Sequence, residues 1–142
     1  MSNAAVRVET EEHQGRTIAT ITLDRPEKRN ALAVDVMRDL LTALREVGRS
    51  DADGVILAAA GPVFSAGHNF GDMAGASLSE ARDLFELCTE MMTAVQQIPQ
   101  PVVAKVHALA TAAGCQLVAT CDLAVAGESA SFAIPGGKGG LF

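Results

Sequence analysis

Short apolar segments that each follow an amphipathic helix constrain the fold more than any other feature of this sequence. Residues 54–60 (GVILAAA) are continuously apolar, and residues 102–106 (VVAKV) are expected as a further buried strand. A strand that is apolar throughout is buried on both faces, which is typical of a parallel sheet covered by helices. The order of the expected elements is β-β-α-β-α-β-α-β-β. It predicts an α/β protein with helices packed on a largely parallel sheet.

The two long helices are expected from apolar residues spaced three and four apart. In residues 31–47 these are Leu32, Val36, Leu40, Leu44 and Val47. The second helix has Ser77 and Glu80 as a capping box at its start, and Pro99 follows its last turn. A hairpin with its turn at Gln14 and Gly15 precedes them. A short helix (112–121) and two brief strands (123–127 and 131–134) follow.

The charge distribution argues against nucleic acid and membrane surfaces as partners. The 142 residues carry a formal net charge of -6, with scattered lysines and arginines. No apolar run approaches the ~20 residues of a membrane-spanning helix, and the N-terminus lacks the blocks of a secretory signal peptide. We therefore expect a cytoplasmic protein. Three cysteines without CxxC spacing are interpreted as small apolar core residues: Cys88, Cys115 and Cys121.

Two loops of small residues each follow a buried strand and lead toward a helix. They are residues 65–69 (SAGHN) and 110–115 (ATAAGC). Small side chains leave main-chain N–H groups open to a ligand, and those at a helix start lie at the positive end of the helix dipole. Side by side, two such loops would form an oxyanion hole that stabilises charge developing on a carbonyl oxygen. Close packing of a helix on a sheet also requires small residues, so spacing alone leaves both interpretations open.

Three segments resemble the crotonase, or enoyl-CoA hydratase/isomerase, superfamily: 21–32 (ITLDRPEKRNAL), 63–73 (VFSAGHNFGDM) and 99–135. The resemblance runs in order from about Ile18 to the chain end. It implies a spiral of β-β-α units that binds acyl-CoA thioesters, with two main-chain N–H groups on the thioester oxygen. By position these donors belong to His68 and Ala113. The resemblance further implies that neighbouring residues line the substrate: Ala66, Gly67, Asn69, Phe70 and Gly114.

The resemblance also suggests where coenzyme A would lie. Lys28 and Arg29 stand in the loop near the CoA end of the family's site, where they could meet phosphate oxygens. Exposed charges in a turn explain them equally well. The His68 ring could act as a general acid or base, but the family pattern favours its main chain. Coenzyme A is part of the substrate, so neither a separate cofactor nor a metal is expected. The resemblance implies a homotrimer or a dimer of trimers. It also implies a role in fatty acid metabolism.

Two positions depart from the pattern of the family's hydratases. Those enzymes carry a glutamate on the helix after the second donor loop and another just after the proline of the following strand. Here the matching residues are Gln116 and Gly136. An amide cannot take up a proton as a carboxylate does, and glycine has no side chain. The sequence therefore favours an acyl-CoA-binding protein that stabilises a thioester enolate, with Gln116 at a catalytic position.

Two alternatives remain open on the sequence. One is a non-catalytic acyl-CoA-binding or interaction protein of the same fold. The other is a hydratase or isomerase whose acid and base lie beyond residue 142. Family members continue with helices that close the acyl pocket and build trimers, so we divide the chain into an N-terminal segment with the first strand (1–15) and an incomplete core (16–142). The PGGKGG segment is no phosphate loop, because neither Ser nor Thr follows Lys138.

Overall fold

The larger of two sheets contains five strands in the computed structural model, which describes residues 4–140. Its strand order is β1-β2-β3-β5-β7. The strands are β1 (Val6–His13), β2 (Arg16–Leu23), β3 (Gly54–Ala59), β5 (Val102–Val106) and β7 (Leu123–Ala126). β1 pairs antiparallel with β2, and the other neighbours pair in parallel. The prediction of an α/β protein with a largely parallel sheet is therefore confirmed.

The β1–β2 hairpin turns at the expected residues. Gln14 and Gly15 both have positive φ, 50° and 76°, as a two-residue type I′ turn requires. The register runs from Val6 opposite Leu23 to His13 opposite Arg16. The division of the chain at residue 15 stays a prediction.

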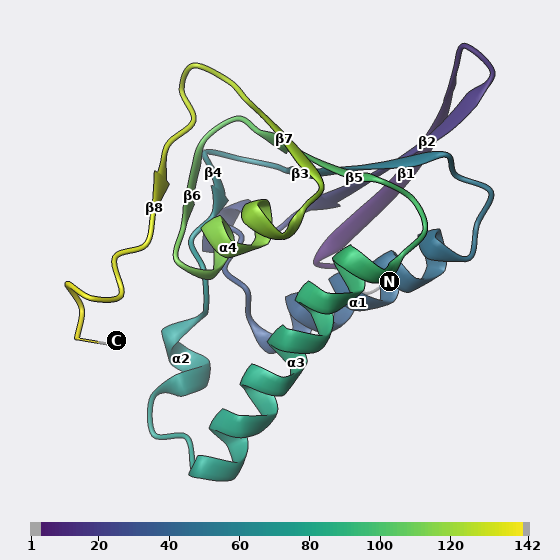
Figure 1. The fold of residues 1–142 in the computed structure, drawn as a ribbon. Helices are drawn as coiled ribbons and strands as arrows, with labels where there is room; N and C mark the ends of the chain where they lie inside the picture. The colour runs from purple at the N-terminus through teal and green to yellow at the C-terminus, as the bar shows by residue number, and fades with distance from the viewer. Residues whose placement is uncertain (1–3, 141–142) are drawn as a thin grey trace.

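Two long helices cover one face of this sheet (Figure 1). α1 (Val34–Gly48) packs on β1 and β2, and α3 (Leu78–Gln97) packs along α1. The capping box at the start of α3 is confirmed, since Ser77 Oγ accepts the Glu80 N–H and the Glu80 carboxylate accepts the Ser77 N–H. α1 begins later than the apolar spacing predicted, because Leu32 lies outside the helix and pairs with His68 in an isolated parallel bridge.

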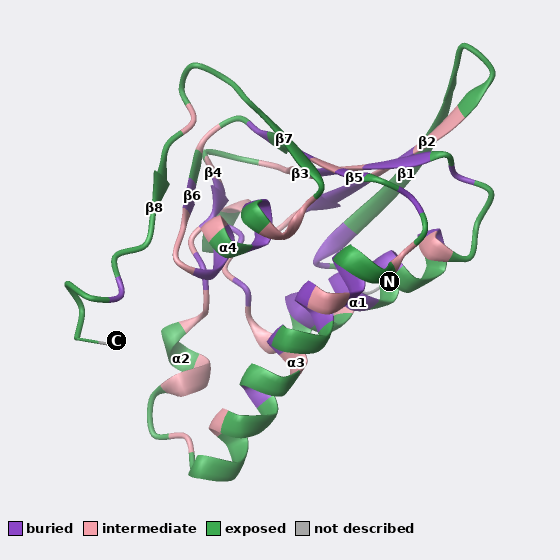
Figure 2. Cartoon of the chain, viewed as in Figure 1, coloured by how far each residue is buried: buried purple, intermediate pink, exposed green. Residues whose placement is uncertain are grey.

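The core lies between these helices and the sheet, where Figure 2 shows the buried residues facing one another. Side chains from β2, β3 and β5 meet those of α1 and α3 there. The largest of them are fully buried: Ile21, Leu57, Leu40, Leu44 and Met91. Together they form one continuous apolar cluster.

A second, smaller sheet was not expected from the sequence. It has the order β4-β6-β8, with β4 (Val63–Ser65), β6 (Leu109–Thr111) and β8 (Phe132–Ala133). We expected β8 as a strand but took β4 and β6 to be loop segments. Strands of three residues are too short to show an alternating pattern, and these pair only with strands distant in sequence.

Three further helical segments complete the fold. η1 (Pro26–Lys28) and α2 (Phe70–Met73) are single turns that the sequence analysis treated as loop. α4 (Ala113–Thr120) lies where a short helix was expected and packs against β4 and β6. The two donor loops therefore join the small sheet to α2 and to α4.

Candidate active site

The small sheet brings the two donor loops together at one edge. β4 and β6 pair in parallel, with Val63 opposite Leu109 and Ser65 opposite Ala110. Neighbouring parallel strands end on the same side of a sheet, so residues 66–69 and residue 112 leave it side by side. β4 and β6 are far apart in the sequence, so their pairing depends on the tertiary structure and not on a local sequence pattern.

Gly67 shows how closely the two loops approach. Its φ is +86°, and a Cβ added there would lie 2.9 Å from Ala112 Cβ and 3.1 Å from the Ala113 main-chain nitrogen. Only glycine adopts this backbone conformation without strain, and only glycine leaves room for the second loop. The expectation that Gly67 keeps the backbone open therefore agrees with the geometry.

The first loop is also held from a third segment. The Leu32 N–H donates to the Gly67 carbonyl at 2.7 Å, and the Ala66 N–H donates to the Arg29 carbonyl at 3.0 Å. Residues 29–32 thus lie along the donor loop as a short, strand-like neighbour.

The main-chain N–H groups of His68 and Ala113 are free to bind a ligand. Within residues 4–140, neither has a hydrogen-bond acceptor. Ala113 is the first residue of α4, where the first N–H groups have no partner inside the helix. Two such donors on touching loops can together stabilise a developing negative charge.

Ala112, which precedes the second donor, has a strained backbone. Its φ is 52° and its ψ is -126°, a combination that residues with a Cβ rarely adopt. Such residues cost on the order of 1–3 kcal/mol and cluster at active sites. The sequence analysis missed Ala112, since an alanine carries no signal of its backbone conformation.

The His68 ring packs against the N-terminal half of α3. It meets Phe85 edge-on, with ring centroids 5.7 Å apart. Burial lowers the pKa of the ring below its ordinary value, while the Leu32 main chain and the charge of Asp72 act in the opposite direction. The Nδ1 atom is buried without a hydrogen-bond partner in the described chain. A lowered pKa favours the neutral ring, which can still accept a proton, so the main-chain role of His68 stays a prediction.

The basic loop lies beside the first donor loop. Lys28 and Asn69 both line an open hollow of about 390 Å³, whereas Arg29 is exposed outside its lining. Arg29 instead has a positive φ of 52° and accepts the Ala66 N–H through its carbonyl. Both cations are exposed, which is compatible with phosphate contacts and with a solvated turn.

The remaining expected site residues differ in burial and in hydrogen bonding. Gln116 is exposed on α4, and its side chain has no hydrogen bond in the described chain. Gly136 is buried in a turn whose Pro135 carbonyl accepts two N–H groups. Phe70 is 68% exposed at the start of α2, and the Asn69 side chain caps that turn by accepting the Gly71 N–H. Gly114 is buried against Ser65.

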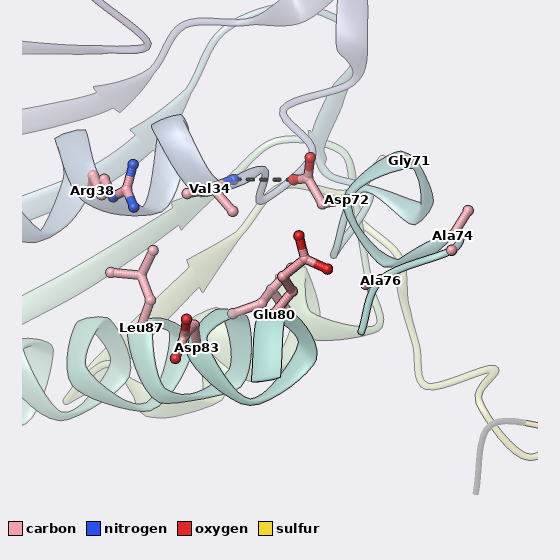
Figure 3. Close-up of a pocket in the computed structure, with 11 residues that line it drawn as sticks. Val34, Arg38, Gly71, Asp72, Ala74, Ala76, Glu80, Asp83 and Leu87 are labelled. Atoms are coloured by element: carbon pink, nitrogen blue, oxygen red, sulfur yellow. Dashed lines mark hydrogen bonds between the residues drawn. The ribbon is translucent and has the colours of Figure 1, made fainter. Parts of the chain in front are cut away.

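A larger hollow lies along the N-terminal half of α3. Figure 3 shows this space of about 470 Å³ between α1, α2 and α3, lined by Arg38, Asp72, Glu80 and Asp83 among others. Neither His68 nor Ala113 lines it. Asp72 accepts the Val34 N–H at 3.2 Å and so ties α2 to the start of α1. We therefore place the candidate site at the donor loops.

The cysteines of the described chain form no second candidate site. Cys88 is buried, Cys115 and Cys121 are half-buried, and all three are free. Burial and the charge of Asp122 raise the pKa of the Cys121 thiol to about 12, so it stays protonated. In the described part of the chain, no three His, Cys, Asp or Glu residues gather as metal ligands would, and no helix could span a membrane.

Comparison with known proteins assigns the chain to a family. The family model described as "Enoyl-CoA hydratase/isomerase" matches residues 13–142. The chain belongs to this family. A zebrafish relative named "Enoyl-CoA hydratase domain-containing protein 3, mitochondrial" is 45% identical over the whole chain and half of the relative. The rat protein of the same name is 43% identical over 94% of the chain and 45% of the relative.

Solved structures show the same crotonase fold. One titled as enoyl-CoA hydratase from Mycobacterium smegmatis superposes with a TM-score of 0.91 and 42% identity, covering 97% of this chain and 53% of that one. The structure of human enoyl-CoA hydratase domain-containing protein 3 superposes at 0.82 with 39% identity, covering 95% and 53%. The predicted crotonase-like spiral is confirmed, and the chain spans about half the length of the relatives it matches.

One expectation is wrong. We expected a cytoplasmic location, but the zebrafish, rat and human relatives carry the word mitochondrial in their names. The lack of a secretory signal distinguishes secreted from internal proteins and says nothing about which internal compartment a protein occupies.

Proposed function

We propose that this member of the enoyl-CoA hydratase/isomerase family binds an acyl thioester of coenzyme A and stabilises its enolate through the N–H groups of His68 and Ala113. The contact between Gly67 and the second loop carries this proposal, because it sets two partner-free donors side by side. Removing one such donor typically costs on the order of 3 kcal/mol of transition-state stabilisation. The strain at Ala112 supports the same interpretation.

The residues around the donors provide little acid–base chemistry. Gln116 offers an amide and Gly136 offers no side chain, so neither can move a proton to or from water. A positioned acid or base contributes roughly 10²- to 10⁴-fold to a rate. We therefore expect very weak hydration of a short enoyl-CoA, while thioester binding and exchange of the α-proton persist.

Hydration of crotonyl-CoA tests this function. Loss of the enoyl-thioester absorbance is followed in the parent and in variants that restore the carboxylates. Gln116→Glu combined with Gly136→Glu should raise the hydration rate more than either change alone, because the two groups act on opposite steps of proton transfer. Fast hydration by the parent that survives both Gln116→Ala and Gly136→Ala would show that the acid and base lie elsewhere.

The second candidate function is non-catalytic binding of an acyl-CoA. The exposed amide of Gln116 at a catalytic position favours it. Incubation with a panel of acyl-CoA thioesters separates the two functions, since a binding protein shows affinity without any product or α-proton exchange. Assembly into a homotrimer remains a separate prediction, to be checked by the mass of the full chain in solution.

A further inference from the structure

Ser65 is the first residue of the first donor loop (65–69), and the sequence analysis gave it no role of its own. It is the last residue of β4 and is fully buried. Its hydroxyl donates to the Asn30 carbonyl at 2.8 Å and accepts the Gly67 N–H at 3.3 Å. Ser65 therefore links residues 29–32 to the loop that carries the first donor.

The Asn30 carbonyl is itself a fixed point. Asn30 is fully buried with a positive φ of 48°, and its amide group donates to the carbonyls of Ala60 and Val63. Its side-chain oxygen accepts the Arg25 N–H at 2.8 Å. These three bonds hold the acceptor of the Ser65 hydroxyl in one place relative to the sheet.

The second donor loop rests on the other side of Ser65. A Cβ added at Gly114 would lie 2.5 Å from the Ser65 carbonyl oxygen, 2.7 Å from its Cβ and 2.8 Å from its Oγ. Gly114 directly follows Ala113, so the start of α4 sits against Ser65 with no space between them. The small buried side chain of Ser65 thus contacts Gly67, which precedes the first donor, and Gly114, which follows the second.

We infer that Ser65 is a positioning residue that sets the spacing between the His68 and Ala113 N–H groups. The inference rests on the proposed function and adds to it the residue that fixes the distance between the two donor N–H groups. Alanine at this position would leave the Asn30 carbonyl and the Gly67 N–H unpaired in a buried place, so the first loop would shift. Displacements of about 1 Å in such a site are enough to weaken binding of a developing oxyanion strongly.

A chromophoric substrate analogue can report how strongly the two donors hydrogen-bond to the thioester carbonyl. The dimethylaminocinnamoyl thioester of coenzyme A absorbs at longer wavelength when hydrogen bonds polarise its carbonyl, so its red shift reports on the donors. Its dissociation constant reports on the whole binding surface. With the full chain, we expect Ser65→Ala to keep the dissociation constant within about threefold while the red shift falls by about half or more.

Ser50→Ala is the matched control. The Ser50 hydroxyl also donates to one carbonyl, that of Val47 at 2.7 Å, and accepts one N–H, that of Ala52 at 3.2 Å. It lies just beyond the C-terminal end of α1, away from the donor loops. Its loss should leave the red shift equal to that of the parent.

Each outcome bears on the assignment. A folded Ser65→Ala variant with the full red shift contradicts it, and so does an equal fall in Ser50→Ala. If Ser65→Ala does not fold, Ser65→Cys is measured instead, because a thiol forms only weak hydrogen bonds. A reduced red shift with retained affinity in that variant supports the assignment. A full red shift contradicts it. A parent without any red shift contradicts the proposed function, and the role of Ser65 falls with it.

Discussion

At the scale of single residues, the proposed site depends on main-chain groups more than on side chains. His68 has an ionisable ring, but the ring packs on Phe85 with its Nδ1 unpaired, while its N–H is open to a ligand. Gly67 and Gly114 act through the absence of a Cβ. The chemistry of this site is therefore read from backbone geometry rather than from residue types.

His68 variants separate the main chain from the ring. His68→Ala retains the N–H, so we expect most of the acyl-CoA affinity to remain. His68→Pro removes that donor and also disfavours the positive φ of the preceding Gly67, so it should weaken binding far more. Calorimetric titration of the two variants, both shown to fold, measures the difference. Equal losses of affinity would mean that the imidazole is the working group.

The buried ring should also make stability depend on pH. Because burial lowers the pKa of His68 below 6.5, the unfolded chain takes up a proton at higher pH than the folded chain does. The free energy of unfolding should therefore fall as the pH drops through about 6.5 toward the lowered pKa. Denaturant midpoints of the parent and His68→Ala between about pH 8 and pH 5 test this. A pH dependence that is the same in both would assign it to other groups.

At the scale of elements, the contact between α4 and β4 is the tightest at the site. Gly114→Ala would place a Cβ 2.5 Å from a main-chain oxygen, which cannot move without shifting the strand. Overpacking of this kind costs about 1–3 kcal/mol, more than the roughly 1 kcal/mol that alanine gains over glycine in a helix. We expect a net loss of stability together with weaker acyl-CoA binding.

Gly54→Ala serves as the control for Gly114→Ala. Gly54 is also a buried glycine, but an added Cβ there would lie 3.6 Å from the nearest atom, an ordinary contact. Chemical denaturation should show a much smaller change for this variant. Comparable losses at the two positions would mean that the close approach of α4 to Ser65 is not what limits substitution.

At the scale of the whole molecule, apolar side chains are exposed around the C-terminal strands. Leu123 and Val125 on β7 are 67% and 65% exposed, and Ile134 after β8 is 60% exposed. β7 is also an edge strand of the larger sheet, with unpaired main-chain groups. Figure 2 shows this region exposed, in contrast to the covered face under α1 and α3.

We expect the isolated 142-residue polypeptide to self-associate through this region. Light scattering during size-exclusion chromatography measures it, and Leu123→Thr with Val125→Thr should reduce the association while preserving the strand. Thr42→Ser on the exposed side of α1 is a control that should change nothing. A monodisperse monomer that melts cooperatively would contradict the prediction.

Local patterns in the sequence were enough to predict the elements of the larger layer. The spacing of apolar residues predicted α1 and α3, the Gln14–Gly15 pair predicted the hairpin turn, and short apolar segments predicted β3 and β5. Each of these features lies within one segment, where side-chain periodicity follows backbone geometry. The family resemblance supplied the donor positions, which neither composition nor spacing distinguished from close helix packing.

Tertiary structure alone decided how the two donor loops come together. β4 and β6 form only by pairing with each other and with β8, so no local pattern marks them. The hydrogen bonds of Asn30 to Ala60 and of Ser65 to Asn30 span 30 and 35 residues of sequence, and the strain at Ala112 has no local sequence signal. The sequence by itself determined the long helices and the strands of the larger sheet, because propensity and periodicity are local. The spacing between two main-chain donors was decided by packing, because that distance belongs to no single segment.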